Sequence, residues 1–244
     1  MDLKVEWLGR MPYRAAWDVQ RARHVARDRD DAPDTLLLVE HDPVLTLGRH
    51  AQDEHIITPA AELARRGIEV IRVERGGEAT YHGPGQLVAY PIVRLRDLPV
   101  LLRPFVRALE LAMGDVAAGY GVQAAPRRGY PGVWVDPDGP LPRKLGALGL
   151  RVERGVTFHG IALNVTTRLD DFGLINPCGM AGLAVTSIAR ESGWTGDVAE
   201  PSTESVERAG ERYAAALTAR LAEAIARSRV EQTAPSGQAA APVV

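Results

Sequence analysis

Apolar residues recur along this chain with two different spacings, which predict a mixture of helices and strands. Apolar positions three to four residues apart indicate helices that bury one face. We expect helices over residues 12–29, 58–67 and 101–120, and a last one that starts at Ser202. Short apolar or alternating runs bounded by turn residues indicate strands. We expect strands over residues 35–40, 44–47, 68–73, 86–93, 132–135, 145–152 and 156–165.

The order of these elements indicates the fold class. Strands outnumber helices and do not alternate with them regularly, which favours an α+β fold over a doubly wound sheet. The last two strands are expected to form a hairpin. Pro91 has no backbone N–H to donate, so its strand is expected at a sheet edge or a bulge. We expect one domain over residues 1–227 and a disordered tail over residues 228–244, which is rich in Ala, Pro, Ser and Gly.

Composition and charge exclude several classes of protein. The chain has 244 residues, a formal net charge of −2 and a single cysteine. No overall basic field favours nucleic acid, and a lone thiol cannot form an internal disulfide. The chain has no apolar signal core after Met1 and no run of about 18 apolar residues that could span a membrane. We therefore expect a cytoplasmic protein.

A glycine-rich stretch over residues 75–86 lies between two predicted strands. Glycine is favoured where the backbone adopts positive φ or approaches a ligand closely. The stretch is either a loop that forms the wall of a binding site or a long hairpin connection punctuated by turn residues. Its glycines fit neither the Walker pattern nor the dinucleotide-binding pattern.

The single cysteine, Cys178, lies in a polar Asn-Pro-Cys-Gly segment, a plausible setting for a nucleophile. The alternative is a buried thiol that acts as a small apolar side chain. A free cysteine with a pKa of about 8.5 is mostly protonated at pH 7, so a catalytic one needs a cation or base nearby. The candidates are Lys144, His82 and His159. Lys144 is one of only two lysines in an arginine-rich chain, and lysine, unlike arginine, can release its proton.

The six histidines do not indicate a metal site. No cysteine or histidine pair has the spacing of zinc ligands. His159 lies within an apolar strand, where a hydrogen-bonded core histidine is more common than a catalyst. Lys144 taken alone could likewise be a solvated loop charge.

Four separate motifs together resemble the octanoyltransferases of lipoate biosynthesis, the LipB family. They are Arg-Gly-Gly-x-x-Thr-Tyr-His-Gly-Pro-Gly-Gln over residues 75–86, Lys-x-Gly-Ala-Leu-Gly over 144–149, Phe-His-Gly-Ile-Ala-Leu-Asn over 158–164, and Asn-Pro-Cys-Gly over 176–179. Their order and spacing match from about residue 36 to 194. The resemblance implies a fold like that of biotin and lipoate protein ligases, a strongly bent mixed sheet flanked by helices.

The resemblance also implies an activity, partners and site residues. The enzyme would move octanoyl from acyl carrier protein to a lysine of lipoyl domains, in 2-oxoacid dehydrogenase E2 subunits and the glycine cleavage H protein, without nucleotide or other cofactor. Cys178 would form the acyl thioester, and Lys144 would lower its pKa. Glu78 and Met180 stand where family members often differ, so neither is assigned a chemical role. The acyl pocket would be lined by Arg75, Gly76, Gly77, Glu78, Ala79, Thr80, Tyr81, His82, Ala147, Leu148, Gly149, Gly160, Ile161 and Ala162, with the small residues leaving a narrow channel.

Two other functions stay open on the sequence alone. An ATP-dependent lipoate or biotin protein ligase would need an adenylate-binding lysine and phosphate contacts but no cysteine. A non-catalytic module that binds acyl groups or lipoyl domains would be favoured by a buried Cys178 distant from Lys144.

Overall fold

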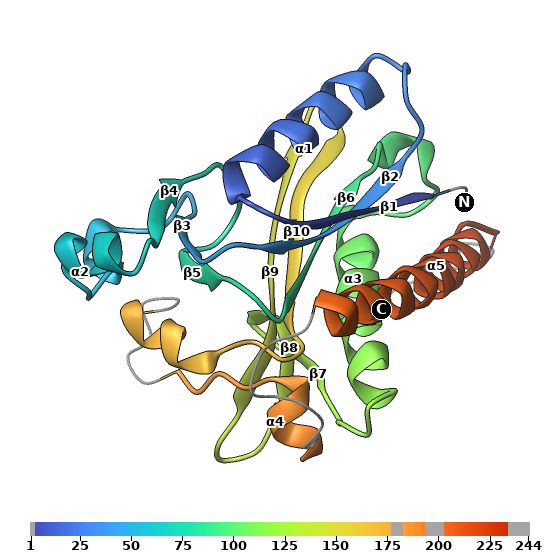
Figure 1. Cartoon of the computed structure of the whole chain (residues 1–244). Helices are drawn as coiled ribbons and strands as arrows, with labels where there is room; N and C mark the ends of the chain where they lie inside the picture. The colour runs from blue at the N-terminus through green and yellow to red at the C-terminus, as the bar shows by residue number, and fades with distance from the viewer. Residues whose placement is uncertain (1–2, 177–182, 194–202, 234–244) are drawn as a thin grey trace, which may run out of the picture.

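The protein was analysed as a computed structural model that describes residues 3–176, 183–193 and 203–233 (Figure 1). The strands are β1 (Lys4–Met11), β2 (Thr35–His41), β3 (Val44–Leu47), β4 (Glu69–Arg72), β5 (Ala79–His82), β6 (Gln86–Ile92), β7 (Ala125–Arg127), β8 (Tyr130–Val135), β9 (Arg143–Glu153) and β10 (Val156–Asn164). The α-helices are α1 (Tyr13–Asp28), α2 (Ala60–Arg65), α3 (Leu102–Ala118), α4 (Ile188–Ser192) and α5 (Thr203–Thr233), with short 3₁₀ turns at Asp53–His55, Leu95–Asp97 and Leu169–Leu174.

Seven strands form one mixed sheet in the order β1-β2-β6-β10-β9-β8-β7. The β1–β2 pair is parallel and the other pairs are antiparallel. A smaller sheet has the order β4-β3-β5. The predicted α+β class and the expected β9–β10 hairpin are confirmed. The sequence analysis missed the edge strands β1 and β7, which are half-exposed or short and carry little apolar signal.

Helices cover both faces of the large sheet (Figure 1). On one face, α3 and α5 bury apolar residues spaced three to four positions apart, such as Phe105, Leu109 and Met113, against β2, β6 and β9. On the other face, α1 packs Ala16 against residues of β2, β6 and β10. None of the helices in the described residues is both long enough and apolar enough to cross a membrane.

The glycine-rich stretch is not a simple loop. Residues 79–82 form β5, which pairs antiparallel with β3, so neither the site-wall loop nor the plain hairpin connection describes it fully. The glycines flank this strand: Gly77 and Gly85 both have φ of +83°, a conformation that residues with a Cβ rarely adopt.

Pro91 lies in a central strand, so the predicted edge position is wrong. β6 runs between β2 and β10, and its ladder with β10 stops at the Ala89–Ile161 pair. Farther along, the Thr157 backbone N–H donates to Val93 O at 2.9 Å. The interruption removes the need for a Pro91 N–H, which is how proline is accommodated inside a sheet.

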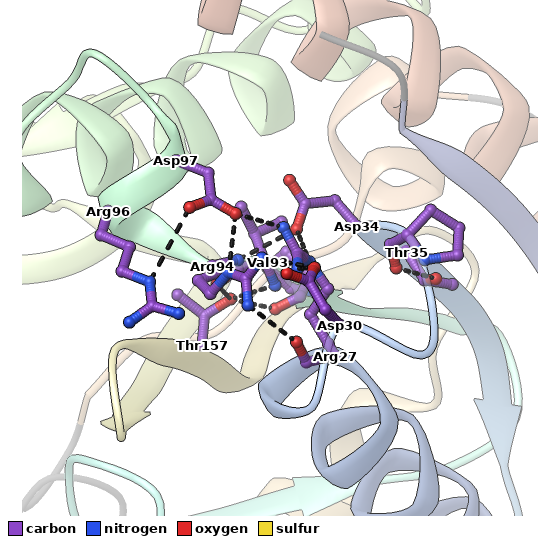
Figure 2. A network of polar contacts seen from close by, with 11 residues as sticks. Arg27, Asp30, Asp34, Thr35, Val93, Arg94, Arg96, Asp97 and Thr157 are labelled. Atoms are coloured by element: carbon purple, nitrogen blue, oxygen red, sulfur yellow. Dashed lines mark hydrogen bonds and ion pairs between the residues drawn. The ribbon is translucent and has the colours of Figure 1, made fainter.

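A buried ion-pair cluster ties the end of α1 to the loops before β2 and after β6 (Figure 2). Arg27 donates to Asp34 and to Asp97, each at 2.6 Å. Arg94 donates to the same Asp97 oxygen at 2.6 Å and, through its backbone N–H, to Asp34 at 3.0 Å. Buried charges persist when they are paired and hydrogen-bonded in this way, so the cluster fixes how α1 leaves the sheet.

The last helix is longer than expected. Residues 228–233 belong to α5, although the sequence analysis placed them in a disordered tail. The segment has no glycine or proline before Pro235, and a proline disfavours helix at the residue before it. That spacing fits a helix that continues to Thr233, and residues 234–244 lie outside the described part of the chain.

Candidate active site

A cavity lies between the small sheet and the α1-covered face of the large sheet. It has a volume of about 810 Å³, including open space at its mouth. Every residue predicted for the acyl pocket lines it except Tyr81. Its remaining lining residues are Tyr13, Gln86, Val88, Tyr90, Lys144, Gly146, His159, Asn164, Phe172, Leu183 and Val185.

Tyr81 faces away from the cavity, which corrects its predicted role. Side chains alternate along β5, so Thr80 and His82 face the cavity while Tyr81 lies among apolar residues behind the small sheet. Its hydroxyl donates to Asp171 at 2.9 Å, and its ring packs edge-on against Phe172. Tyr81 therefore supports the wall from behind.

The glycines of the cavity allow backbone segments to approach one another. A Cβ on Gly149 would lie 2.8 Å from Gly76 O, where the two sheets meet. A Cβ on Gly160 would lie 2.0 Å from Ala89 O and 2.7 Å from Cδ of Pro91. Gly160 therefore leaves room for β6 and not for a ligand, although the sequence analysis assigned its small size to the channel.

A β-bulge brings Lys144 to the cavity. Val133 of β8 faces Gly146, whereas Trp134 faces Lys144, so β9 carries one extra residue, Leu145. Leu145 is fully buried in the core beneath α3, and a Cβ on Gly146 would point into the same core, 2.8 Å from Met113 Sδ. With regular alternation, the side chains of Lys144 and Ala147 would lie on opposite faces of the sheet. The bulge puts both on the cavity side, a known way to re-aim a side chain beside a site.

The segment that carries Cys178 lies outside the described residues, but the described residues on either side of it adjoin the cavity. Asn176 shares a neighbouring hollow with Phe172, Leu183 and Val185, and these last three also line the cavity. Val185 forms a parallel bridge with Lys144. The Lys144 N–H donates to Ala184 O at 2.8 Å, which fixes this part of the chain beside Lys144.

A directed series of hydrogen bonds crosses the polar side of the cavity. Arg75, which can only donate, bonds Thr46 Oγ1 at 2.9 Å, and that hydroxyl lies 3.4 Å from His82 Nε2. His82 Nδ1 lies 2.7 Å from Gln86 Oε1, and Gln86 Nε2 donates to Asn164 Oδ1 at 2.9 Å. The amide oxygen accepts, so His82 carries a proton on Nδ1.

The same series ends beside Lys144. Asn164 Nδ2 donates to Thr186 O at 2.9 Å, and the Thr186 N–H donates to Lys144 O, also at 2.9 Å. The backbone of Lys144 is thus connected to the polar wall through directed bonds, and its position depends on residues from four other strands, β3, β5, β6 and β10.

Two neutral histidines lie in the interior next to the cavity. Tyr90 Oη lies 2.7 Å from His41 Nε2, and His41 Nδ1 lies 3.3 Å from Met11 O. Burial lowers the pKa of His41 to about 4. Burial, with the nearby His41 and Arg75, lowers the pKa of His82 well below its ordinary value. His82 is therefore occupied as a structural donor and lacks a free position for general base chemistry.

His159 is the third histidine at the cavity. It is 1% exposed and has φ of +58°, an unusual conformation for a residue with a Cβ. Its ring nitrogens have no hydrogen-bond partner among the described residues, and Nε2 lies 3.7 Å from Glu74. The expectation of a hydrogen-bonded core histidine is therefore only half right: His159 is buried, but its ring is paired at most electrostatically.

The sequence analysis missed several polar lining residues, including Tyr13, Tyr90 and Asn164. Tyr90 and Asn164 occupy strand positions whose side could have been read from alternation, but the sequence alone does not reveal which face of the sheet holds a cavity.

Comparison with known proteins agrees with this fold and site. Residues 12–209 match the family described as the lipoyl protein ligase A/B catalytic domain. The chain is 45% identical over 213 residues to an octanoyltransferase of Chloroflexus aurantiacus, covering 87% of this chain and 94% of the relative. It is 45% identical over 228 residues to an octanoyltransferase of Mycolicibacterium gilvum, covering 93% and 90%.

Solved structures show the same fold at low sequence identity. A bipartite lipoate protein ligase from Thermoplasma acidophilum superimposes with a TM-score of 0.65 at 16% identity, covering 95% of this chain and 93% of that chain. A lipoate-protein ligase A bound with ATP gives a TM-score of 0.62 at 16% identity, covering 95% of each chain. The mixed sheet flanked by helices is therefore the ligase-like fold, as expected. Together with the close relatives, this shows that the chain belongs to the octanoyltransferase family of acyltransferase enzymes.

Proposed function

We propose that this enzyme moves an octanoyl group from octanoyl-acyl carrier protein to a lysine of lipoyl domains, through a thioester on Cys178 assisted by Lys144. The acceptors would be 2-oxoacid dehydrogenase E2 subunits and the glycine cleavage H protein, in the cytoplasm, as the first step of endogenous protein lipoylation. The observation that carries the proposal is the bulge that turns Lys144 into a largely apolar cavity, next to the segment leading to Cys178, in a chain of this family.

The first half-reaction exchanges one thioester for another. The Cys178 thiolate, favoured by the Lys144 ammonium, attacks the carbonyl carbon of the donor thioester. The carbon–sulfur bond to the carrier breaks, and its leaving thiolate takes the proton from Lys144. The products are the Cys178 octanoyl thioester, the free carrier thiol and a neutral Lys144 amine. Because the donor thioester is already activated, this step needs no nucleotide.

The second half-reaction forms the amide. The acceptor lysine is cationic at pH 7, with a reference pKa of about 10.4. The neutral Lys144 amine takes one proton from it, the acceptor nitrogen attacks the acyl carbon and releases a second proton to solvent, and the bond to Cys178 sulfur breaks. The thiolate and the Lys144 ammonium are restored. Thioester to amide is downhill, so the transfer goes to completion.

The cavity suits a straight alkyl chain. From Gly146 to Gly149, β9 advances about 10 Å along the cavity at roughly 3.4 Å per residue, a length comparable with an extended octanoyl chain. Ala147, Ala162 and Val88 present apolar surface to this path, whereas the side chains of Ile161 and Leu148 pack in the core beneath α3.

The test separates a transferase from an ATP-dependent ligase. Purified protein is mixed with octanoyl-carrier protein and an apo lipoyl domain without nucleotide, and in parallel with free octanoate and ATP. We expect the domain to gain octanoyl only from the carrier protein. Modification only with octanoate and ATP would identify a ligase. Tight binding of the lipoyl domain without modification in either mixture would identify a binding module.

A further inference from the structure

The side chain of Trp134 lies against Lys144. Trp134 faces Lys144 across the β8–β9 pair, immediately beside the bulge. The Lys144 ammonium nitrogen lies 5.2 Å from the centroid of the indole ring. This is within the distance at which an aromatic face attracts a cation.

The surroundings make this contact effective. Trp134 is fully buried, and its Nε1 donates to Tyr130 O at 3.1 Å, so the ring is held in one orientation. Cation–π attraction is strongest with tryptophan and grows when the pair is removed from water. Val133, the preceding residue, faces the opposite core, so Trp134 is the residue of β8 that meets Lys144.

We propose that Trp134 is a positioning residue for Lys144, whose ammonium its indole face holds at the cavity wall. This rests on the proposed role of Lys144 in transfer. The contact favours the ammonium over the amine, so it stabilises the state in which Lys144 is charged beside the thiolate, before acylation and again after amide formation. It also restricts the flexible lysine side chain to the cavity side of β9.

Several other charged groups lie around Lys144 and the indole ring. Arg127 of β7 lies 5.5 Å from the same indole centroid. The adjacent Arg143 donates to Glu191 of α4 at 2.7 and 2.9 Å. Glu191 raises the pKa of this guanidinium, and the nearby Asp136 raises it further. His82 lines the cavity from β5 and is neutral, as described above.

The chain allows a direct measurement, because Lys4 and Lys144 are its only lysines. In a Lys4→Arg, Cys178→Ala background, protein labelled with ¹³C at lysine Cε gives a single Lys144 signal, without a coupled thiol. The wild-type Trp134 protein should show an upfield ring-current shift of the Lys144 Hε protons. Trp134→Leu should remove this shift and reduce the ammonium-to-amine ratio by about threefold to thirtyfold, lowering the titration midpoint by about 0.5 to 1.5 pH units. Trp134→Phe, which keeps an aromatic face, should lie between them.

Val133→Ala is the matched control, since it weakens the same strand on its other face and should leave the midpoint unchanged. In the otherwise unmodified enzyme, Trp134→Leu should slow Cys178 acylation, and Trp134→Phe should slow it less.

The proposal is overturned if the Lys144 Hε protons show no ring-current shift, or if the Lys144 titration midpoint is the same with Trp, Phe and Leu at position 134. If Trp134→Leu does not fold, the ring-current shift in the wild type and the titration midpoint of Trp134→Phe still test the proposal. If the wild type forms no acyl-enzyme, the proposed function fails while the titration still tests the contact.

Discussion

Ala162 and Gly160 lie two residues apart on β10, and substitution at each should have a different effect. Ala162 faces the cavity, is 6% exposed and lies between Val88 and Ala147 on the neighbouring strands. Ala162→Leu adds three carbons to the path proposed for the alkyl chain. Overfilling a packed site costs about 1–3 kcal/mol, which corresponds to about fivefold to 150-fold at 1.4 kcal/mol per factor of ten.

The assay compares kcat/KM for butanoyl, hexanoyl and octanoyl carrier-protein donors. We expect Ala162→Leu to lower kcat/KM for the octanoyl donor by about fivefold to 150-fold relative to the butanoyl donor. The reason is that only the longer chain needs the space that the leucine fills. Parallel losses for all three donors would refute the placement of the chain along β10.

Gly160→Ala is the control for this prediction. Its Cβ would overlap Ala89 O at 2.0 Å, a backbone atom that cannot move alone. We expect destabilisation of about 1–3 kcal/mol or more in urea unfolding, with an unchanged ratio of octanoyl to butanoyl rates in the folded protein. A shifted ratio with normal stability would show that Gly160 does face the chain.

Three further predictions concern the scaffold. Asp34→Ala removes the buried carboxylate from Arg27, which keeps its bond to Asp97, and should cost about 1–3 kcal/mol in urea unfolding; a loss well below about 1 kcal/mol would mean that water replaces the carboxylate. The pKa of about 4 for His41 lies below its unfolded value of about 6.5, so stability should fall by about 3 kcal/mol as the pH drops from 6.5 to 4. That slope should be lost in His41→Asn, and an equal slope would assign it to other groups. Tyr81→Phe loses only the hydrogen bond to Asp171 and should cost about 1 kcal/mol without changing chain-length preference; a changed preference would return Tyr81 to the cavity.

The parts of the fold set by local pattern could be predicted from the sequence. The β9–β10 hairpin follows from alternation around a turn, and α3 follows from residues such as Phe105 and Met113 at helical spacing. Except for Tyr81, the residues that the motifs predicted for the acyl pocket line this cavity. These successes share one cause, because each depends on residues close together in the chain.

The remaining features depend on pairing between distant segments. The bulge at Leu145 exists only relative to β8, and alternation alone would have turned Lys144 away from Ala147. Pro91 looked like an edge residue because the interruption that accommodates it occurs in β10. Gly160 looked like part of a channel because nothing in its own segment shows that Ala89 lies against it.

The most direct test of the account is intact mass spectrometry of the enzyme after mixing with octanoyl-carrier protein, without nucleotide or acceptor. We predict a mass increase of one octanoyl group in the wild type, and none in Cys178→Ala. Lys144→Arg keeps the charge but accepts no proton, so it should hold the octanoyl group even after a lipoyl domain is added, whereas the wild type should lose it. The absence of any adduct, or an adduct that persists in Cys178→Ala, would contradict transfer through Cys178.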